Sequence, residues 1–319
     1  MGKAAACNKS RTVVLLTKHT FMVYFEEQED EKMKIIDIIK SEKPTLSFEV
    51  FPPKTGDKFE SVKHATEEIA AIKPDFMSVT YGAGGGTSEF TADIAANIQN
   101  NYGVPVLAHL TCVSSTKEKI QSVIKNLKSK NIENILALRG DIPDGLDMSN
   151  LDYHYASELI REIKPGGEFC IGGACYPENH PDSENSYEDI KHLKEKVDSG
   201  CEFMTTQMFF DNNILYNFIY RVREAGINIP IVAGIMPVTN AAQIKRIMSI
   251  SQSALPQRFV RIVDRYGSNP EAMKQAGIAY ATEQIIDLYA NGIGAVHIYS
   301  MNKPDVAKAI KDNVSYIIK

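Results

Sequence analysis

The sequence predicts an α/β protein that folds as a single-domain (β/α)8 TIM barrel. Short apolar runs of strand length recur along the chain, and longer amphipathic segments separate them. The runs are too apolar for half-exposed strands and suit a parallel sheet that helices cover. Eight such runs in 319 residues fit a barrel of roughly 250 residues with insertions. In order, the runs are residues 45–51, 76–82, 105–111, 134–140, 170–176, 203–210, 229–236 and 295–300.

Helical patterns connect these runs. Apolar residues recur at helical spacing in segments 57–73, 116–130, 187–199 and 213–225. The connection between the seventh and eighth runs is longer, and residues 255–264 and 271–290 predict extra helices there. The regular pattern begins at Met33. We therefore assign residues 33–319 to the barrel and treat residues 1–32 as an N-terminal appendage.

Composition excludes several classes of function. A net charge of -5 and a pI near 5.9 argue against nucleic-acid binding, which normally needs a basic surface. No run approaches the roughly 20 apolar residues of a membrane span, and residues 1–32 lack the cleavage site of a secretion signal. The cysteines are odd in number and form no CxxC pair, so we expect reduced core residues. We expect a cytoplasmic protein.

A doubly wound dinucleotide-binding fold is the structural alternative. Its fingerprint, GxGxxG, opens a helix directly after the first strand. Here the first run ends in Pro52 and Pro53 without such a loop. The glycine cluster at 82–86 follows the second run, and the third glycine position of the motif falls on Thr87. The motif is therefore absent, and any dinucleotide must be bound in another way.

Polar residues gather at the carboxyl ends of the runs, where barrels of this class place their active sites. Glu49 is the most informative, because a carboxylate between Phe48 and Val50 is costly to bury without a partner or a proton. The other strand-end residues are Thr80, Tyr81, His109, Arg139, Asp141, Tyr176, His180, Gln207, Asp211, His297 and Tyr299.

Eight short motifs follow one another along the predicted strands and their carboxyl ends. They are SFEVFPPK at 47–54, SVTYG at 78–82, AHLTC at 108–112, ALRGD at 137–141, YPENHP at 176–181, TQMFFD at 206–211, GIMPV at 234–238 and HIYSMN at 297–302. They resemble, in order, the signatures of the bacterial methylenetetrahydrofolate reductase family. One motif alone would be weak support, but eight in the same order over residues 45–302 are not expected by chance.

The resemblance implies an enzyme that uses FAD. Members of the family take hydride from NADH or NADPH, release the nicotinamide, and then reduce 5,10-methylenetetrahydrofolate to 5-methyltetrahydrofolate on the same flavin. By this resemblance Glu49 is the general acid that helps to open the methylene bridge to a 5-iminium ion. Asp141 lies near flavin and pterin, where its negative charge favours hydride release and the cationic iminium.

The resemblance also implies binding residues. The substrate residues are Gln207, Gln243, Lys303 and Thr80, and two of the FAD residues, His180 and Lys196, suit the diphosphate. The full FAD shell is Thr80, Tyr81, Ala83, His109, Arg139, Gly140, Asp141, Tyr155, Ala156, Tyr176, His180, Asp189 and Lys196. The family tends to form homo-oligomers. NADH, NADPH or an electron-transferring partner subunit would each serve as electron donor, and the sequence does not choose among them.

The chain departs from the family pattern at three places, and alternatives remain. Residues 84–87 are Gly-Gly-Gly-Thr where some relatives carry Asn, Ser and charged residues, and Ile247 stands where some have Phe. Lys303 replaces an Arg that often meets the folate tail, so we expect weaker tail binding.

A Schiff-base lyase needs a lysine on a barrel strand, and no run contains one. A metal site needs clustered ligands, which His109 and His180 alone do not make. The alternative from another class is a non-catalytic barrel subunit that binds pterin or folate. The presence of Glu49 argues against that role.

Overall fold

The computed structural model describes residues 34–53, 55–81, 88–143, 145–147, 149, 151–244, 247 and 254–319. Lys34–Lys319 is one compact unit. The predicted appendage, residues 1–32, and the predicted FAD residue Ala83 lie outside the described residues.

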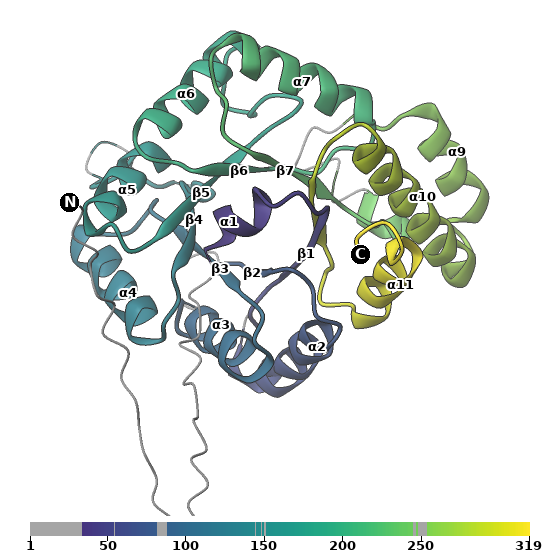
Figure 1. Cartoon of the computed structure of the whole chain (residues 1–319), viewed down its shortest axis with the longest axis horizontal. Coiled ribbons are helices and arrows are strands. Elements are labelled where there is room, and N and C mark those ends of the chain that lie inside the picture. The colour runs from purple at the N-terminus through teal and green to yellow at the C-terminus, as the bar shows by residue number, and fades with distance from the viewer. Residues whose placement is uncertain are drawn as a thin grey trace, which may run out of the picture. The chain divides into compact units, whose positions relative to one another are not determined.

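Eight parallel strands close into a barrel in chain order, which confirms the predicted fold class (Figure 1). Each strand forms from one of the apolar runs. The register places Glu49 of the first strand beside Ser78 of the second and Tyr299 of the eighth. The strands are β1 (Thr45–Val50), β2 (Met77–Val79), β3 (Val106–Thr111), β4 (Asn134–Leu138), β5 (Cys170–Cys175), β6 (Phe203–Thr206), β7 (Ile231–Ile235) and β8 (Ala295–Tyr299).

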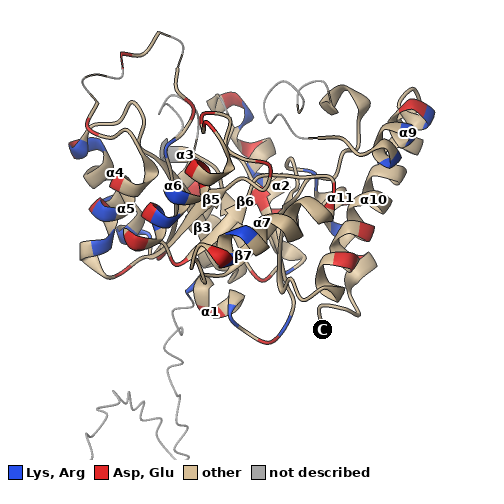
Figure 2. Ribbon diagram, turned by 90° about the horizontal axis from the view of Figure 1, so that it is seen from above, with Lys and Arg blue, Asp and Glu red and all other residues tan. Residues whose placement is uncertain are grey.

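Helices surround the barrel, and their charged residues of both signs lie outside the strands (Figures 1 and 2). The described helices are α1 (Ile35–Ile39), η1 (Gly56–Lys58), α2 (Phe59–Ala71), α3 (Ser88–Tyr102), α4 (Lys117–Ser129), α5 (Ala156–Ile163), η3 (Lys164–Gly166), α6 (Ser186–Asp198), α7 (Asn212–Glu224), α9 (Gln257–Tyr266), α10 (Pro270–Ala290) and α11 (Pro304–Val314). Helices α9 and α10 occupy the long connection between β7 and β8, as predicted.

Helix α1 closes the amino-terminal end of the barrel and sits at its centre in Figure 1. Ile35, Ile36 and Ile39 pack with residues that begin or precede the strands, including Phe76 and Phe203. The first amide of the helix is satisfied because Ile35 N donates to Asn134 Oδ1 at 2.9 Å. With this end filled, the opposite end of the barrel is left for ligands.

Among the described residues, no helix is long and apolar enough to cross a membrane. Within the same ranges, His, Cys, Asp and Glu side chains form no group of three or more that could hold a metal ion. Cys112, Cys170, Cys175 and Cys201 are free and buried, as predicted for these four.

Candidate active site

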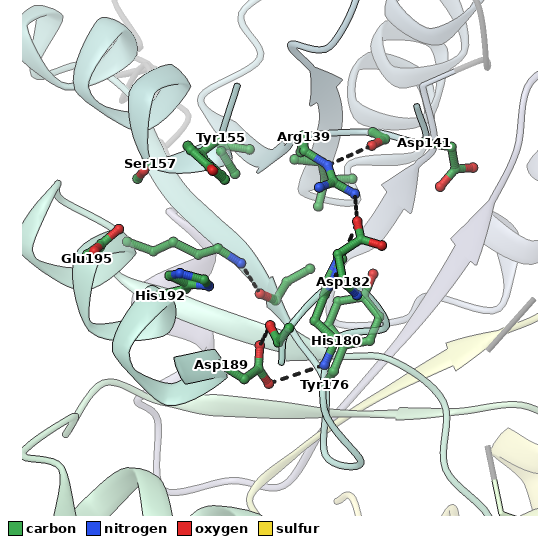
Figure 3. Close-up of a pocket in the computed structure, with 17 residues that line it drawn as sticks. Arg139, Asp141, Tyr155, Ser157, Tyr176, His180, Asp182, Asp189, His192 and Glu195 are labelled. Atoms are coloured by element: carbon green, nitrogen blue, oxygen red, sulfur yellow. Dashed lines mark hydrogen bonds and ion pairs between the residues drawn. The ribbon is translucent and has the colours of Figure 1, made fainter. Parts of the chain in front are cut away.

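A pocket of about 530 Å³ opens at the carboxyl ends of β4 and β5, between these strands and helices α5 and α6 (Figure 3). It brings together most of the residues predicted to bind FAD. These are Arg139, Gly140, Asp141, Tyr155, Ala156, Tyr176, His180, Asp189 and Lys196. Thr80, Tyr81 and His109, which were predicted for the same cofactor, are not among the residues that line it.

One face of α6 forms a wall of the pocket. Asn185 caps the helix by accepting hydrogen bonds from two backbone amides of the first turn. Asp189, His192 and Lys196 then follow at helical spacing and line the pocket. Lys196 Nζ donates to Ala174 O at 2.8 Å, which holds the cation against β5. Burial lowers the pKa of Lys196.

The loop after β5 is organised by Asp189, which is buried. Its two carboxylate oxygens accept hydrogen bonds from His180 N at 3.3 Å and Ser183 Oγ at 3.2 Å. His180 Nδ1 in turn accepts from Asp182 N at 3.1 Å, so in the neutral ring Nε2 carries the proton. Burial, helped by the charge of Arg139, lowers the pKa of His180. His180 is therefore a hydrogen-bond donor here rather than a cation.

Arg139 is placed on the opposite wall by an ion pair with Asp182 (Figure 3). The two side chains meet at 2.7 Å between Nη2 and Oδ2, and the arginine side chain is 22% exposed. The hydrogen bond from Arg139 lowers the pKa of Asp182. Sequence reasoning missed Asp182, although it lies just beyond the YPENHP motif. It also missed His192, which the helical spacing from Asp189 and Lys196 could have indicated.

Gly140 is required where β4 leaves the barrel. Its φ of +88° lies in the left-handed region, and a Cβ atom there would stand 3.0 Å from the Cβ of Thr111 and 3.1 Å from Cγ1 of Val113. A side chain at this position would therefore be strained and crowded. Asp141 follows as an exposed residue of the pocket lining.

Glu49 and His109 face each other in the mouth of the barrel. Glu49 Oε2 lies 3.6 Å from His109 Nε2, and the two side chains are 20% and 8% exposed. Burial raises the pKa of Glu49 to about 8. Burial lowers the pKa of His109 to about 3. Nε2 of His109 has no hydrogen-bond partner among the described residues.

The predicted substrate residues Gln243 and Lys303 meet at Thr239, which sequence reasoning missed. Gln243 Oε1 accepts hydrogen bonds from the backbone amides of Thr239 and Asn240, both at 3.1 Å. Lys303 Nζ donates to Thr239 Oγ1 at 2.7 Å. Gln207, after β6, accepts from Met208 N through its side-chain oxygen. Thr80 follows β2 and is half-buried.

Comparisons with known proteins identify a family to which the chain is similar. The family model described as methylenetetrahydrofolate reductase matches residues 34–315. The chain is 37% identical over 303 residues to methylenetetrahydrofolate reductase (NADH) 1 of Arabidopsis thaliana, covering 89% of this chain and 51% of the relative. It is 32% identical over 265 residues to 5,10-methylenetetrahydrofolate reductase of Escherichia coli K12, covering 83% of this chain and 88% of the relative.

The chain spans about half the length of the plant relatives that it matches. One solved structure is similar in fold, with a TM-score of 0.62 at 15% identity, over 89% of this chain and 100% of the other. It is an uncharacterized protein from Clostridium thermocellum that binds two copies of 5-methyl-5,6,7,8-tetrahydrofolic acid.

Proposed function

This chain belongs to the methylenetetrahydrofolate reductase family, and we propose that it reduces 5,10-methylenetetrahydrofolate to 5-methyltetrahydrofolate with FAD and electrons from NAD(P)H. One observation carries the proposal beyond family membership. Glu49 is a mostly buried carboxyl group with a pKa raised to about 8, so it holds a proton at neutral pH in the mouth of the barrel. A reaction that begins by protonating a folate nitrogen needs such an acid.

The residues of the pocket fit FAD. Arg139 and Lys196 bring two cations to opposite walls, which suits a diphosphate. The neutral ring of His180 adds a hydrogen-bond donor. Bound flavin would supply hydride transfer between the nicotinamide and the folate. Relatives from plants carry NADH in their names, which favours NADH as the donor.

Glu49 would donate its proton to N10 of the folate as the bond from N10 to the methylene carbon breaks. The remaining 5-iminium cation then accepts hydride at that carbon and becomes the N5-methyl group. Asp141 lies at the pocket rim, where its carboxylate would stabilise this cation. Burial lowers the pKa of His109 to about 3, so its neutral ring is too weak a base to take the proton from Glu49.

Glu49→Gln tests the proposal, because glutamine keeps the size and removes the titratable proton. The variant should keep the yellow colour of bound flavin and most of the rate of flavin reduction by NAD(P)H. Its rate of flavin oxidation by methylenetetrahydrofolate should fall at least about a hundredfold, since positioned acids contribute about 10²–10⁴-fold. Stopped-flow absorbance of the flavin measures both steps.

Asp75→Asn is the matched control, because it removes a carboxyl group at the other end of the barrel. Asp75 precedes β2 and accepts a hydrogen bond from Leu46 N. This variant should change neither step selectively. Equal losses of both steps in Glu49→Gln would mean that Glu49 only shapes the pocket. A colourless protein that binds folate would instead support a non-catalytic binding subunit.

A further inference from the structure

A buried histidine, His297 of β8, links two serines inside the barrel. Its Nδ1 lies 2.7 Å from Ser47 Oγ of β1, and its Nε2 lies 2.9 Å from Ser78 Oγ of β2. The ring is 2% exposed, the serines are fully buried, and Phe76 stacks on it. Burial lowers the pKa of His297 to about 3, so the ring is neutral. One ring nitrogen therefore carries a proton and the other accepts one.

Ser47 determines which nitrogen carries the proton. Its Oγ also lies 3.1 Å from the backbone oxygen of Val296, which can only accept a hydrogen bond. A serine hydroxyl has a single proton, and this contact uses it. Nδ1 of His297 must then donate to Ser47, which leaves Nε2 as an acceptor. Ser78 can satisfy that acceptor only by donating its own hydroxyl proton.

The last link of this chain is Glu49, which stands beside Ser78 in the strand register and hydrogen-bonds with it. If Ser78 donated its proton to Glu49, this bond would lower the pKa of the carboxyl group and oppose the effect of burial. The contacts of His297 with Ser47 and Ser78 exclude that direction. Ser78 has no second proton to donate, so it offers Glu49 only lone pairs. A carboxylic acid can bond with such an acceptor, whereas a carboxylate cannot.

We propose that Ser47, His297 and Ser78 form a one-way hydrogen-bond chain that holds Glu49 in its protonated form. The three residues are positioning residues, because none of them needs to touch a substrate. Their role in catalysis rests on the proposed function, since the hydrogen-bond chain keeps Glu49 protonated until a folate nitrogen accepts the proton. The direction of the hydrogen bonds is a property of the protein alone and can be tested without folate.

The other titratable groups that face Glu49 do not interfere with a titration of its carboxyl group. His109, from β3, has a pKa near 3 and is neutral above about pH 5. Tyr299, from β8, has a pKa raised well above its ordinary value by burial and donates its hydroxyl proton to Thr206 O. Among the described groups that face it, a titration between about pH 5 and 9 therefore belongs to Glu49.

The first measurement is the tautomer of His297 in the intact protein. Nitrogen-15 NMR of labelled imidazole distinguishes a protonated ring nitrogen from an unprotonated one, and loss of the signal in His297→Gln assigns it. We expect the proton on Nδ1 throughout the neutral range. A proton on Nε2, or a charged ring at pH 7, would overturn the proposal. The tautomer itself is measured in the wild-type protein, and the His297→Gln variant serves only to assign the signal.

The second measurement follows the Glu49 carboxyl carbon by carbon-13 NMR, assigned by its loss in Glu49→Gln. In Ser47→Ala, Nδ1 loses its acceptor, so the proton can move to Nε2 and free the Ser78 proton for Glu49. The titration midpoint of Glu49 should then fall by about one pH unit or more. Thr45→Val, which removes another buried hydroxyl of β1 outside the chain of contacts, should leave it unchanged.

An unchanged midpoint in a folded Ser47→Ala protein would overturn the proposal. A protein that shows the Nδ1 tautomer and the shifted midpoint but does not reduce methylenetetrahydrofolate would refute only the proposed function. The reverse result, an active reductase with the other tautomer, would refute only the hydrogen-bond chain. The two ideas therefore fail separately.

Discussion

Glu49 Oε2 and His109 Nε2 lie 3.6 Å apart, yet these two side chains do not form an ion pair at neutral pH. Burial raises the pKa of the carboxyl group to about 8 and lowers that of the imidazole to about 3. Between these values neither group carries a charge. A neutral acid beside a neutral histidine can lose its proton to a ligand, whereas a carboxylate paired with imidazolium could not donate one.

The rate of the folate step should report the pKa of Glu49. Because only the protonated acid acts, the rate should be constant below about pH 8 and fall about tenfold for each pH unit above it. Stopped-flow oxidation of the flavin by methylenetetrahydrofolate, measured from pH 6 to 10, checks this. Reduction of the flavin by NAD(P)H should lack the same break. A break near the ordinary value of 4.5 would show that burial does not control this group.

The same carboxyl group should lower the free energy of unfolding of the protein at neutral pH. Its pKa is higher in the folded state than in the unfolded state, so the stability it contributes is full below pH 4.5 and is lost as pH rises towards 8. At pH 7 the loss is on the order of 3 kcal/mol. Glu49→Gln should therefore be more stable than the wild type.

Urea unfolding at several pH values measures this effect. The advantage of Glu49→Gln should be small at pH 5 and should grow up to about pH 8. His109 and His297 titrate equally in both proteins, so their contributions cancel in the difference. An advantage that does not change with pH would mean that Glu49 has the same pKa in the folded and unfolded chains.

Much of the fold could be predicted because each strand corresponds to a local sequence pattern, a short apolar run between amphipathic segments. Glu49 could be singled out for a similar reason, since its neighbours Phe48 and Val50 are apolar. The pocket residues were predicted through the resemblance to the family, and several of them, such as Tyr155, Asp189 and Lys196, lie outside the eight motifs.

The remaining features depend on contacts between distant segments. Arg139 and Asp182 are 43 residues apart, and no local pattern pairs them. The contacts of His297 with Ser47 and Ser78 span 250 and 219 residues. They exist only because β8 closes the barrel against β1. A histidine at a strand end was visible in the sequence, but its tautomer depends on this closure.

FAD retention should depend on Lys196. We expect Lys196→Ala to weaken FAD binding by roughly ten- to a hundredfold, as a lost charge-assisted hydrogen bond is worth about 1.5–3 kcal/mol. Flavin fluorescence during titration of the apoprotein gives the Kd. Lys194→Ala is the control, since Lys194 lies on the same helix but pairs with Asp198 outside the pocket. Equal Kd values for the two variants would remove Lys196 from the FAD site.

The appendage should be dispensable for catalysis. Lys34–Lys319 forms one compact unit that holds the pocket and Glu49. A chain that lacks residues 1–32 should therefore retain its flavin content, its thermal midpoint and both flavin rates. Absorbance at the flavin band and thermal unfolding compare it with the full chain. Loss of flavin or precipitation of the shortened chain would show that the segment contributes to the barrel.

Gly140 should tolerate no side chain, whereas Gly145 in the same loop offers a matched control. Both residues have positive φ, +88° and +78°, so alanine strains the backbone at either site. At Gly140 the added Cβ also meets a neighbour, the Thr111 side chain at 3.0 Å, whereas at Gly145 no atom of the described residues lies within 4 Å. Gly145→Ala should cost on the order of 1 kcal/mol of unfolding free energy.

Gly140→Ala should cost more, by roughly 1–3 kcal/mol, because the crowding adds to the strain. It should also lose flavin, since relief of the contact moves the wall of the pocket that carries Arg139. Thermal unfolding and the flavin content after dialysis compare the two variants. Equal stability and full flavin in both would show that β4 can shift at this point without disturbing the site, and the requirement for glycine would then lie in the backbone conformation alone.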